Sequence, residues 1–307
     1  MSTWPLISAA LEALERAQVG LSRRERGRLK DVPVTAMVAA VRARRDFVYG
    51  DVGEEARAVV DRVRRLGGDD WVGRYLRLVQ LALVATYTER SVPLVLPPTV
   101  ARMLEEELAA IVADVEPEDG WTFDLGHDGL YKRLAIGAGS MVSVGTFTVG
   151  GPMCVTQDIV DACDAAEPEL AVWLRAHRRP WLDPHIHQAR LDEYEREGRA
   201  RAFRLMAELL EANPDYHGVL AAPWMYDPVV AEISPHLAYV REQVLEGGAT
   251  LFPLGSSDAV IAHAIATSRT RRRLYEEGRY MPTAYVYLWR RHDLVAWSRR
   301  TDCPDAD

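Results

Sequence analysis

The sequence predicts an α/β (α+β) protein, in which a helical N-terminal region precedes a mixed sheet with flanking helices. Three observations lead to this prediction. Apolar residues recur every three or four positions through the first third of the chain, which is typical of amphipathic helices. Gly, Thr, Val and Ser then dominate residues 120–152 in short alternating runs, which favours strands. From Trp181 onward, strand-like and helix-like segments alternate, as in a partly parallel sheet.

The size and composition of the chain are those of a globular protein. Its 307 residues suffice for one large domain or for two ordinary ones of about 100 to 200 residues each. The 48% of hydrophobic and 27% of charged residues exclude disordered and collagen-like proteins. We expect a boundary near residue 118, in the acidic stretch 116–120. The predicted domains are therefore a helical N-terminal region, 1–118, and an α/β domain, 119–307.

The elements of the N-terminal region follow from its apolar stripes. The clearest helix begins at Pro97-Pro98-Thr99, after which apolar residues recur from Val100 to Val115. Residues 120–152 predict two or three strands joined by glycine turns, and 155–178 predict a further helix. Similar helical stripes lie at about 5–17, 33–45, 54–66 and 72–89.

The elements of the second half end at Gly, Asn or Pro residues. The last two predicted strands flank the polar turn 290–293, so we expect the sheet to end in an antiparallel hairpin. Strands are predicted at 181–189, 216–224, 249–254, 283–290 and 293–298. Helices are predicted at 191–212, 229–246 and 257–277.

Two histidines, His185 and His187, lie on one face of the predicted strand 181–189, because side chains alternate along a strand. Two imidazoles can bind a metal, but no third ligand follows at a recognisable spacing, so no metal site is assigned. His187 lies near the carboxyl end of the strand, where α/β proteins tend to bind ligands. It is a candidate general base or substrate-orienting group, and otherwise a structural histidine.

The buried strand predicted within 217–228 ends in Trp224, Tyr226 and Asp227. Asp227 can cap the next helix, whose first position suits Pro228. Alternatively, the three side chains form the rim of a pocket, and a carboxylate beside aromatic rings suits an amine or ammonium substrate.

The block 233–241, ISPHLAYVR, opens a helix whose N-terminal amide groups can hold an anion. Arg241 lies about two turns into this helix, where it suits either a substrate or a surface ion pair. Tyr239 and Arg241, together with Trp224 and Tyr226, are the candidate substrate-binding residues.

The most distinctive block is 267–288, TSRTRRRLYEEGRYMPTAYVYL. It resembles the end of the GNAT acyltransferase fold, where a helix closing in a Leu-Tyr-Glu-like sequence precedes a glycine, an aromatic residue and the final two strands. The strand, helix and strand predicted between 216 and 254 follow the order of that family, so the resemblance covers about residues 215–298. The same block and ISPHLAYVR also resemble sequences of a broad bacterial family. In GNAT enzymes the tyrosine of this helix commonly serves as general acid to the leaving thiolate, which implies that role for Tyr275.

The expected function is therefore acyl transfer, in which an amine, hydroxylamine or hydroxyl of a small acceptor attacks an activated acyl group. Such a site needs a base, hydrogen-bond donors for the oxyanion and an acid for the leaving group. His187 or Asp227 is the candidate base, strand amides near Ala222 to Trp224 are the candidate oxyanion donors, and Tyr275 is the candidate acid.

The glycine-rich pyrophosphate signature of the GNAT family is absent, so no cofactor is expected. Arginine clusters favour an aminoacyl-tRNA donor, because guanidinium groups bind phosphate bidentately. Arg269, Arg271 and Arg272 are the candidate donor-binding residues. A carrier-protein thioester, or one of coenzyme A, is the alternative donor. Resemblance to tRNA-dependent transferases places the reaction in specialised metabolism.

Two other classes stay open: a non-catalytic binding or scaffold protein, and a metal-dependent enzyme that uses His185 and His187. The net charge of −8 disfavours a DNA partner. No apolar run approaches the ~20 residues that cross a bilayer, and no secretion signal is recognised, so no membrane partner and a cytoplasmic location are expected. Three cysteines without CxxC spacing predict neither disulfides nor structural zinc.

Overall fold

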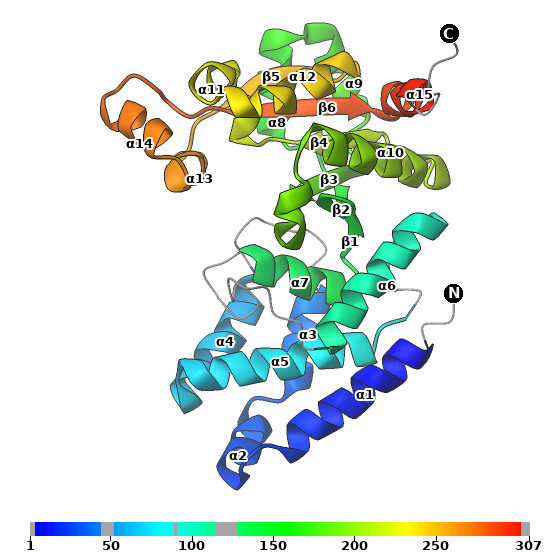
Figure 1. Ribbon diagram of the computed structural model, residues 1–307, viewed down its shortest axis with the longest axis vertical. Coiled ribbons are helices and arrows are strands. Elements are labelled where there is room, and N and C mark those ends of the chain that lie inside the picture. Colours follow the sequence, from blue (N-terminus) through cyan, green and yellow to red (C-terminus); the bar gives the residue numbers. More distant parts are fainter. Residues whose placement is uncertain (1–3, 44–51, 89–90, 114–127, 302–307) are drawn as a thin grey trace. The chain divides into compact units, whose positions relative to one another are not determined.

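The computed structural model describes residues 4–43, 52–88, 91–113 and 128–301. They form two compact units, which are described separately (Figure 1). Unit 1 comprises the described residues up to Gly151 and the segment Ile186–Leu191, and unit 2 comprises Pro152–His185 and the described residues from Asp192 on. The boundary predicted near residue 118 lies outside the described residues.

Unit 1 consists mainly of helices. The stripes predicted at 5–17, 33–45, 54–66, 72–89 and after Pro97 correspond to five of them. Its helices are α1 (Trp4–Val19), α2 (Arg23–Asp31), α3 (Val34–Ala43), α4 (Glu54–Gly67), α5 (Asp69–Ala85), α6 (Pro98–Val112) and α7 (Asp128–Ala138).

Helix α2 was not predicted, because its sequence RRERGRLKD has no buried residue and so no apolar stripe. Its N-terminus is fixed by a capping box, in which the side chains of Ser22 and Glu25 each accept a hydrogen bond from the backbone of the other residue. Local capping therefore defines this helix where hydrophobic periodicity does not.

Helix α5 forms the centre of the core of unit 1. Its residues are buried almost all round, which is typical of a helix enclosed by others. It contacts α1, α3, α4 and α7. At Gly137 of α7, an added Cβ atom would lie 3.3 Å from Cβ of Leu83, so a small residue permits the close approach of α7 to α5.

A β-hairpin follows α7. Strands β1 (Met141–Val144) and β2 (Phe147–Met153) are antiparallel, and Val144 pairs with Phe147 across a two-residue turn. Gly145 has a positive φ of 61°, which such turns require and glycine adopts at no steric cost. The prediction of strands within 120–152 is thus correct for the hairpin and wrong for residues 128–138, which form α7.

Unit 2 contains a mixed sheet with the strand order β3-β4-β6-β5. Strand β4 pairs with β3 in parallel, through Leu182 and Val219, and with β6 antiparallel. Strand β5 also pairs with β6 antiparallel. The strands are β3 (Trp181–Ile186), β4 (Gly218–Ala221), β5 (Thr250–Gly255) and β6 (Ala284–Arg290).

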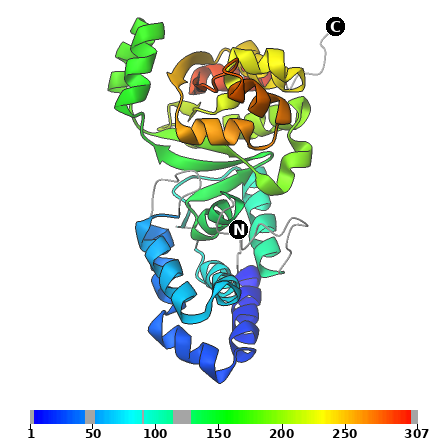
Figure 2. The same cartoon turned by 90° about the vertical axis from the view of Figure 1, so that its left-hand side faces the viewer.

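Helices cover both faces of this sheet, and β6 shows how its side chains are divided between them. Val286 and Leu288 belong to a core cluster with residues of α8 and α9. Those two helices are the green pair at the upper left of Figure 2. On the opposite face, Trp289 packs against Phe203 of α10 and Trp297 of α15, with ring centroids 5.0 Å and 5.2 Å away. This alternation is the period-two pattern of a strand buried on both sides.

The helices of unit 2 confirm the predicted alternation of helices and strands, and with the mixed sheet they confirm the α+β class. They are α8 (Gln157–Ala166), α9 (Pro168–Ala176), α10 (Arg196–Ala212), α11 (Pro228–Ile233), α12 (Ala238–Glu246), α13 (Asp258–Ala266), α14 (Arg269–Glu276) and α15 (Arg291–Thr301). Short 3-10 helices are η3 (Gln188–Glu193), η4 (Trp224–Tyr226) and η5 (Pro235–Leu237).

Four predicted boundaries in unit 2 are corrected. The helix expected at 155–178 is interrupted at Glu167 and forms α8 and α9. The helix expected at 229–246 is interrupted at Ser234-Pro235, and the helix expected at 257–277 restarts at Ser268, which caps α14. The strand expected at 293–298 is part of α15, so the sheet does not end in a hairpin. The reason is the three- and four-residue spacing of the buried Leu294, Trp297 and Ser298, which places them on one helix face.

Among the described residues, no helix has the length and apolar character needed to cross a membrane.

Candidate functional site

Polar side chains gather at the carboxyl ends of the parallel strands β3 and β4 in unit 2, where open α/β sheets commonly bind ligands. On β3, Nε2 of His185 lies 3.0 Å from Oδ2 of Asp183, and both side chains are largely buried. His185 therefore has a carboxylate neighbour on its own strand. The sequence prediction considered His185 only as a metal ligand.

Arg199 of α10 is fully buried beside this edge and is enclosed by aromatic rings. Its guanidinium lies 5.0 Å from the ring centre of Tyr194 and 5.9 Å from those of Tyr226 and Tyr239. It donates hydrogen bonds to the hydroxyl groups of Tyr226, at 3.0 Å, and of Tyr194. Tyr226 and Tyr239, which were candidate substrate-binding residues, thus contact an internal arginine.

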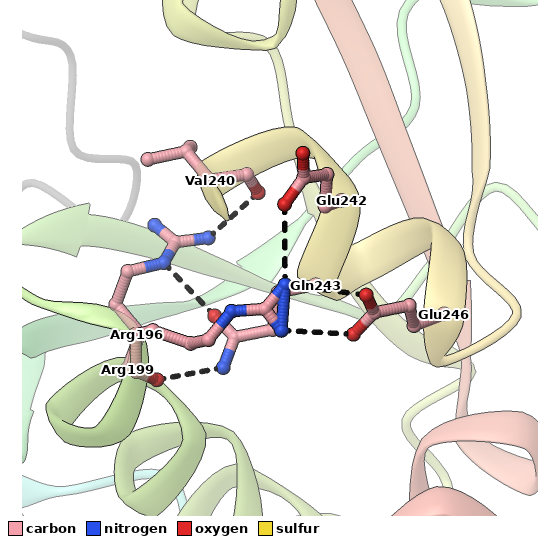
Figure 3. A network of polar contacts seen from close by, with 6 residues as sticks. All are labelled: Arg196, Arg199, Val240, Glu242, Gln243 and Glu246. Atoms are coloured by element: carbon pink, nitrogen blue, oxygen red, sulfur yellow. Dashed lines mark hydrogen bonds and ion pairs between the residues drawn. The ribbon is translucent and has the colours of Figure 1, made fainter. Parts of the chain in front are cut away.

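The charge of Arg199 is retained despite its burial. Burial by itself lowers the pKa of the guanidinium, but Tyr194 and Tyr226 raise it, and the resulting pKa lies above the ordinary value. Arg199 also donates to the carbonyl oxygen of Val240, at 3.1 Å, and to Oε1 of Gln243, at 3.2 Å (Figure 3). The cation is therefore held by neutral oxygen atoms of α12 as well as by the phenols.

Arg196, also on α10, makes further contacts with α12 at the protein surface. Its guanidinium lies 3.2 Å from carboxylate oxygens of Glu242 and of Glu246, and its carbonyl oxygen accepts a 2.8 Å hydrogen bond from Nε2 of Gln243 (Figure 3). These contacts join α10 to α12. They hold the helix that carries Tyr239 and Arg241 in a fixed position relative to α10.

Asp227 lies just after β4 and is only 4% exposed. Its Oδ1 accepts a 3.0 Å hydrogen bond from the amide of Val229, so the predicted helix-cap role is confirmed. Burial raises the pKa of this carboxyl group above its ordinary value, although backbone amides of Val229 and Thr283 and the charge of Arg241 act in the opposite direction. A buried carboxyl group with a raised pKa is a typical feature of acid-base catalysts.

Two phenols on the last part of the chain are electrostatic neighbours of Asp227. Burial, and then the charge of Asp227, raise the pKa of Tyr280 to about 12 and also raise that of Tyr285. The hydroxyl of Tyr280 is buried and has no hydrogen-bond partner among the described residues. Arg241 lies 5.4 Å from the ring centre of Tyr285 and donates a 2.6 Å hydrogen bond to the carbonyl oxygen of Tyr226.

The sequence analysis did not select Tyr280 or Tyr285. The alternation of Tyr285 and Tyr287 on β6 places both on one face of the sheet, which is a signal that the sequence contains. Their position near the end of β4 depends on the pairing of Ala221 with Tyr287. Tyr287 is fully buried, burial raises its pKa, and its ring centre lies 4.8 Å from that of Tyr226.

The candidate acid Tyr275 is half-buried on α14. The charge of Asp227 helps to raise the pKa of Tyr280, so Tyr280 lies in the electrostatic neighbourhood of Asp227. The role of Tyr275 stays a prediction.

The three candidate donor-binding arginines lie in different environments. Arg271 is buried, with its guanidinium 4.5 Å from the ring centre of Trp224 and a 3.1 Å hydrogen bond to Oγ of Ser234. Burial lowers its pKa. Arg269 and Arg272 are exposed at the surface of α14.

His187 belongs to unit 1, whereas Asp227 and Tyr275 belong to unit 2. Its Nε2 lies 2.8 Å from Oε1 of Glu107 and 3.2 Å from Oγ of Ser143. Because serine and carboxylate meet the same nitrogen, this is not the arrangement of a Ser-His-acid triad, where they contact opposite nitrogens. The partner Glu107 was not selected from the sequence.

A pocket in unit 2, away from Asp227 in its lining residues, has a volume of about 610 Å³ and contains aromatic and basic side chains. The rings of Trp173 and His177 are stacked, with centroids 4.2 Å apart, and the edge of His217 meets His177 at 5.0 Å. Arg290 and Arg291 also line it. Across the described ranges, no group of three or more His, Cys, Asp or Glu side chains is arranged to hold a metal ion.

Comparisons of the chain with protein-family models, with curated proteins and with solved structures found no match.

Proposed function

We propose that unit 2 is an acyltransferase that moves an activated acyl or aminoacyl group to a small amine, hydroxylamine or hydroxyl acceptor. The observation that carries the proposal is Asp227, a buried carboxyl group with a raised pKa between η4 and α11, in the electrostatic neighbourhood of Tyr280 and Tyr285. In this role Asp227 takes a proton from the attacking nucleophile, and a phenol gives one to the leaving group.

The order of elements supports the proposal. The resemblance to the GNAT fold rests on a strand, a helix, a strand, a helix and a final strand, and β4, α12, β5, α14 and β6 occur in that order. The parallel pair β3 and β4 also supplies a sheet edge at which both carboxyl ends meet. Helix α15 stands where the resemblance led us to expect a further strand.

The roles of the candidate residues follow from their surroundings. Tyr280 is the favoured acid by its electrostatic contact with Asp227, while Tyr275 is favoured by the resemblance alone. Arg241 and Tyr285 lie beside Asp227 and are suited to orient an acceptor. Trp224 has a structural role in this scheme, because its ring packs against the guanidinium of Arg271.

An aminoacyl-tRNA is the favoured donor, because Arg269 and Arg272 are exposed on α14 and can contact phosphate groups. Arg271 is excluded from direct donor binding in this scheme, since its guanidinium is buried against Trp224 and Ser234. A carrier-protein or coenzyme A thioester is the alternative donor. The reaction would take place in the cytoplasm, where charged tRNA is made, as part of specialised metabolism.

The test is donor consumption by the purified protein. Total tRNA charged with radiolabelled amino acids, and separately a series of acyl thioesters, are incubated with a panel of small amines and alcohols, and products are identified by mass spectrometry. Wild-type protein is expected to consume one donor class. Asp227→Asn retains a capping oxygen but cannot accept the proton, so its rate should fall by about 10² to 10⁴.

The matched control is Asp258→Asn, which changes an exposed aspartate in the first turn of α13. This variant should react like the wild type. Failure of every donor, or an Asp227→Asn variant that reacts at the wild-type rate, contradicts the proposal and favours the binding or scaffold class.

A further inference from the structure

Unit 1 contains a pocket of its own, with a volume of about 280 Å³. It is formed by α6, α7, β2 and the segment that follows β3. Its volume is close to the lower end of the range of about 300 to 1,000 Å³ found for small-molecule sites, so its ligand is a small one. Charged side chains of both signs line it, together with apolar ones from Ala110 and Ile136.

The acidic side of the pocket is Glu107. One oxygen, Oε1, makes the 2.8 Å contact with His187 and lies 3.9 Å from Nε of Arg190. Burial alone would raise the pKa of Glu107, but His187, Arg190 and Arg133 outweigh it and hold the pKa below its ordinary value. The carboxylate is therefore ionised at neutral pH, and its contacts with His187 and Arg190 in the described part of the chain are made by Oε1.

The basic side of the pocket comes from two successive residues of α7, Lys132 and Arg133, which are both buried. Lys132 forms an ion pair with Asp128 and donates a 2.8 Å hydrogen bond to the carbonyl oxygen of Ile186. Arg133 donates a 3.2 Å hydrogen bond to the carbonyl oxygen of Ala110 on α6. These contacts fix both cations at the wall of the pocket.

We propose that this pocket binds a free α-amino acid. Its ammonium group would contact Glu107, its carboxylate would lie toward Arg133 and Lys132, and its side chain would pack on Ala110 and Ile136. A ligand with both charges matches the two signs of charge in the lining, whereas an amine alone also meets Lys132 and Arg133, and an acid alone also meets Glu107, without an opposite charge of its own. The proposal concerns unit 1 and does not depend on acyl transfer by unit 2.

The experiment is isothermal titration calorimetry of the full chain with each of the twenty L-α-amino acids at neutral pH. At least one with an apolar side chain is expected to bind. If leucine binds, 3-methylbutylamine, which lacks the carboxylate, and 4-methylpentanoate, which lacks the ammonium group, should each bind at least tenfold more weakly. If another amino acid binds, the amine and the acid derived from it in the same way are used as the single-charge analogues.

Two variants on α6 locate the site. Ala110→Leu places a larger side chain at the pocket wall and should abolish binding, whereas Ala109→Leu adds the same group at the exposed neighbouring position and should leave the affinity unchanged. Glu107→Gln should weaken binding at least tenfold, with folding checked by circular dichroism. The proposal is overturned if no amino acid binds, if either single-charge analogue binds as tightly, or if Ala110→Leu binds like Ala109→Leu.

Discussion

The guanidinium of Arg271 lies 4.5 Å from the ring centre of Trp224, inside unit 2. This contact joins α14 to the 3-10 helix that follows β4, directly before Asp227. Arg271 also bonds to the carbonyl oxygen of Ala264 and to Ser234, so one cation connects three segments of the chain. Arg271 therefore has a structural role in unit 2.

Arg271→Ala should destabilise unit 2 by about 2 to 4 kcal/mol, because it removes a buried cation-π contact and leaves hydrogen-bond acceptors without their donor. Arg269→Ala removes an exposed arginine from the start of the same helix and should change stability by no more than about 0.5 kcal/mol. Urea unfolding of both variants measures the difference. Equal stabilities would show that Arg271 is not anchored as described.

Arg199→Met should also lower the free energy of unfolding by about 2 to 4 kcal/mol, since the hydroxyl of Tyr226 and the carbonyl of Val240 lose their buried donor. Arg201→Met is the control, because the ion pair that Arg201 forms with Glu197 is exposed to solvent. Thermal unfolding of the two variants should differ clearly. A wild-type melting temperature for Arg199→Met would be the contrary result.

Asp227→Asn should not destabilise the protein at neutral pH. The raised pKa means that the folded state favours the protonated carboxyl group, and the stability due to that proton is lost as pH rises through the folded pKa. Asparagine resembles the protonated form, so the variant should be equally or more stable at pH 7. Its advantage should vanish as pH falls below about 3.8, the unfolded pKa. A variant less stable at pH 7 would contradict the raised pKa.

His217 predicts a second pH effect. Burial lowers its pKa, as do the charges of His177 and Arg291, although a hydrogen bond to the carbonyl oxygen of Arg179 opposes them. The unfolded chain then binds more protons below about pH 6.5, so stability should fall as pH decreases from 6.5 toward the folded pKa. His217→Gln should reduce this loss. His292→Gln, at a side chain that is 91% exposed, should leave the profile unchanged in urea titrations from pH 8 to 5.

Elements with a clear local hydrophobic pattern were predicted from the sequence, and elements defined by other features were missed. Helix α6 was predicted because its stripe is local, and α2 was missed because charged residues and a cap define it. Residues 293–298 were read as a strand, although the spacing of Leu294 and Trp297 already fits a helix face. Hydrophobic periodicity over only six residues does not distinguish a helix from a strand.

In the candidate sites, local contacts were predictable from the sequence and contacts between distant residues were not. The cap formed by Asp227 was predictable, since it depends on Pro228 and Val229 beside it. The proximity of Tyr280 was not, because it arises from the packing of Tyr280 in one hydrophobic cluster with Val230 of α11, a residue far away in the sequence. The contact of Glu107 with His187 joins residues that are far apart in the sequence, and no local pattern announces it.

The strand order of unit 2 has a consequence for biosynthesis. Strand β6 lies between β4 and β5, although it is made after both. A nascent chain that has completed β5 therefore carries two strands, each with an open edge that only β6 can fill, and such edges invite pairing with other chains. The order of the four strands can be completed only after the ribosome has released β6, so until then the edges of β4 and β5 that later pair with β6 are open to other chains.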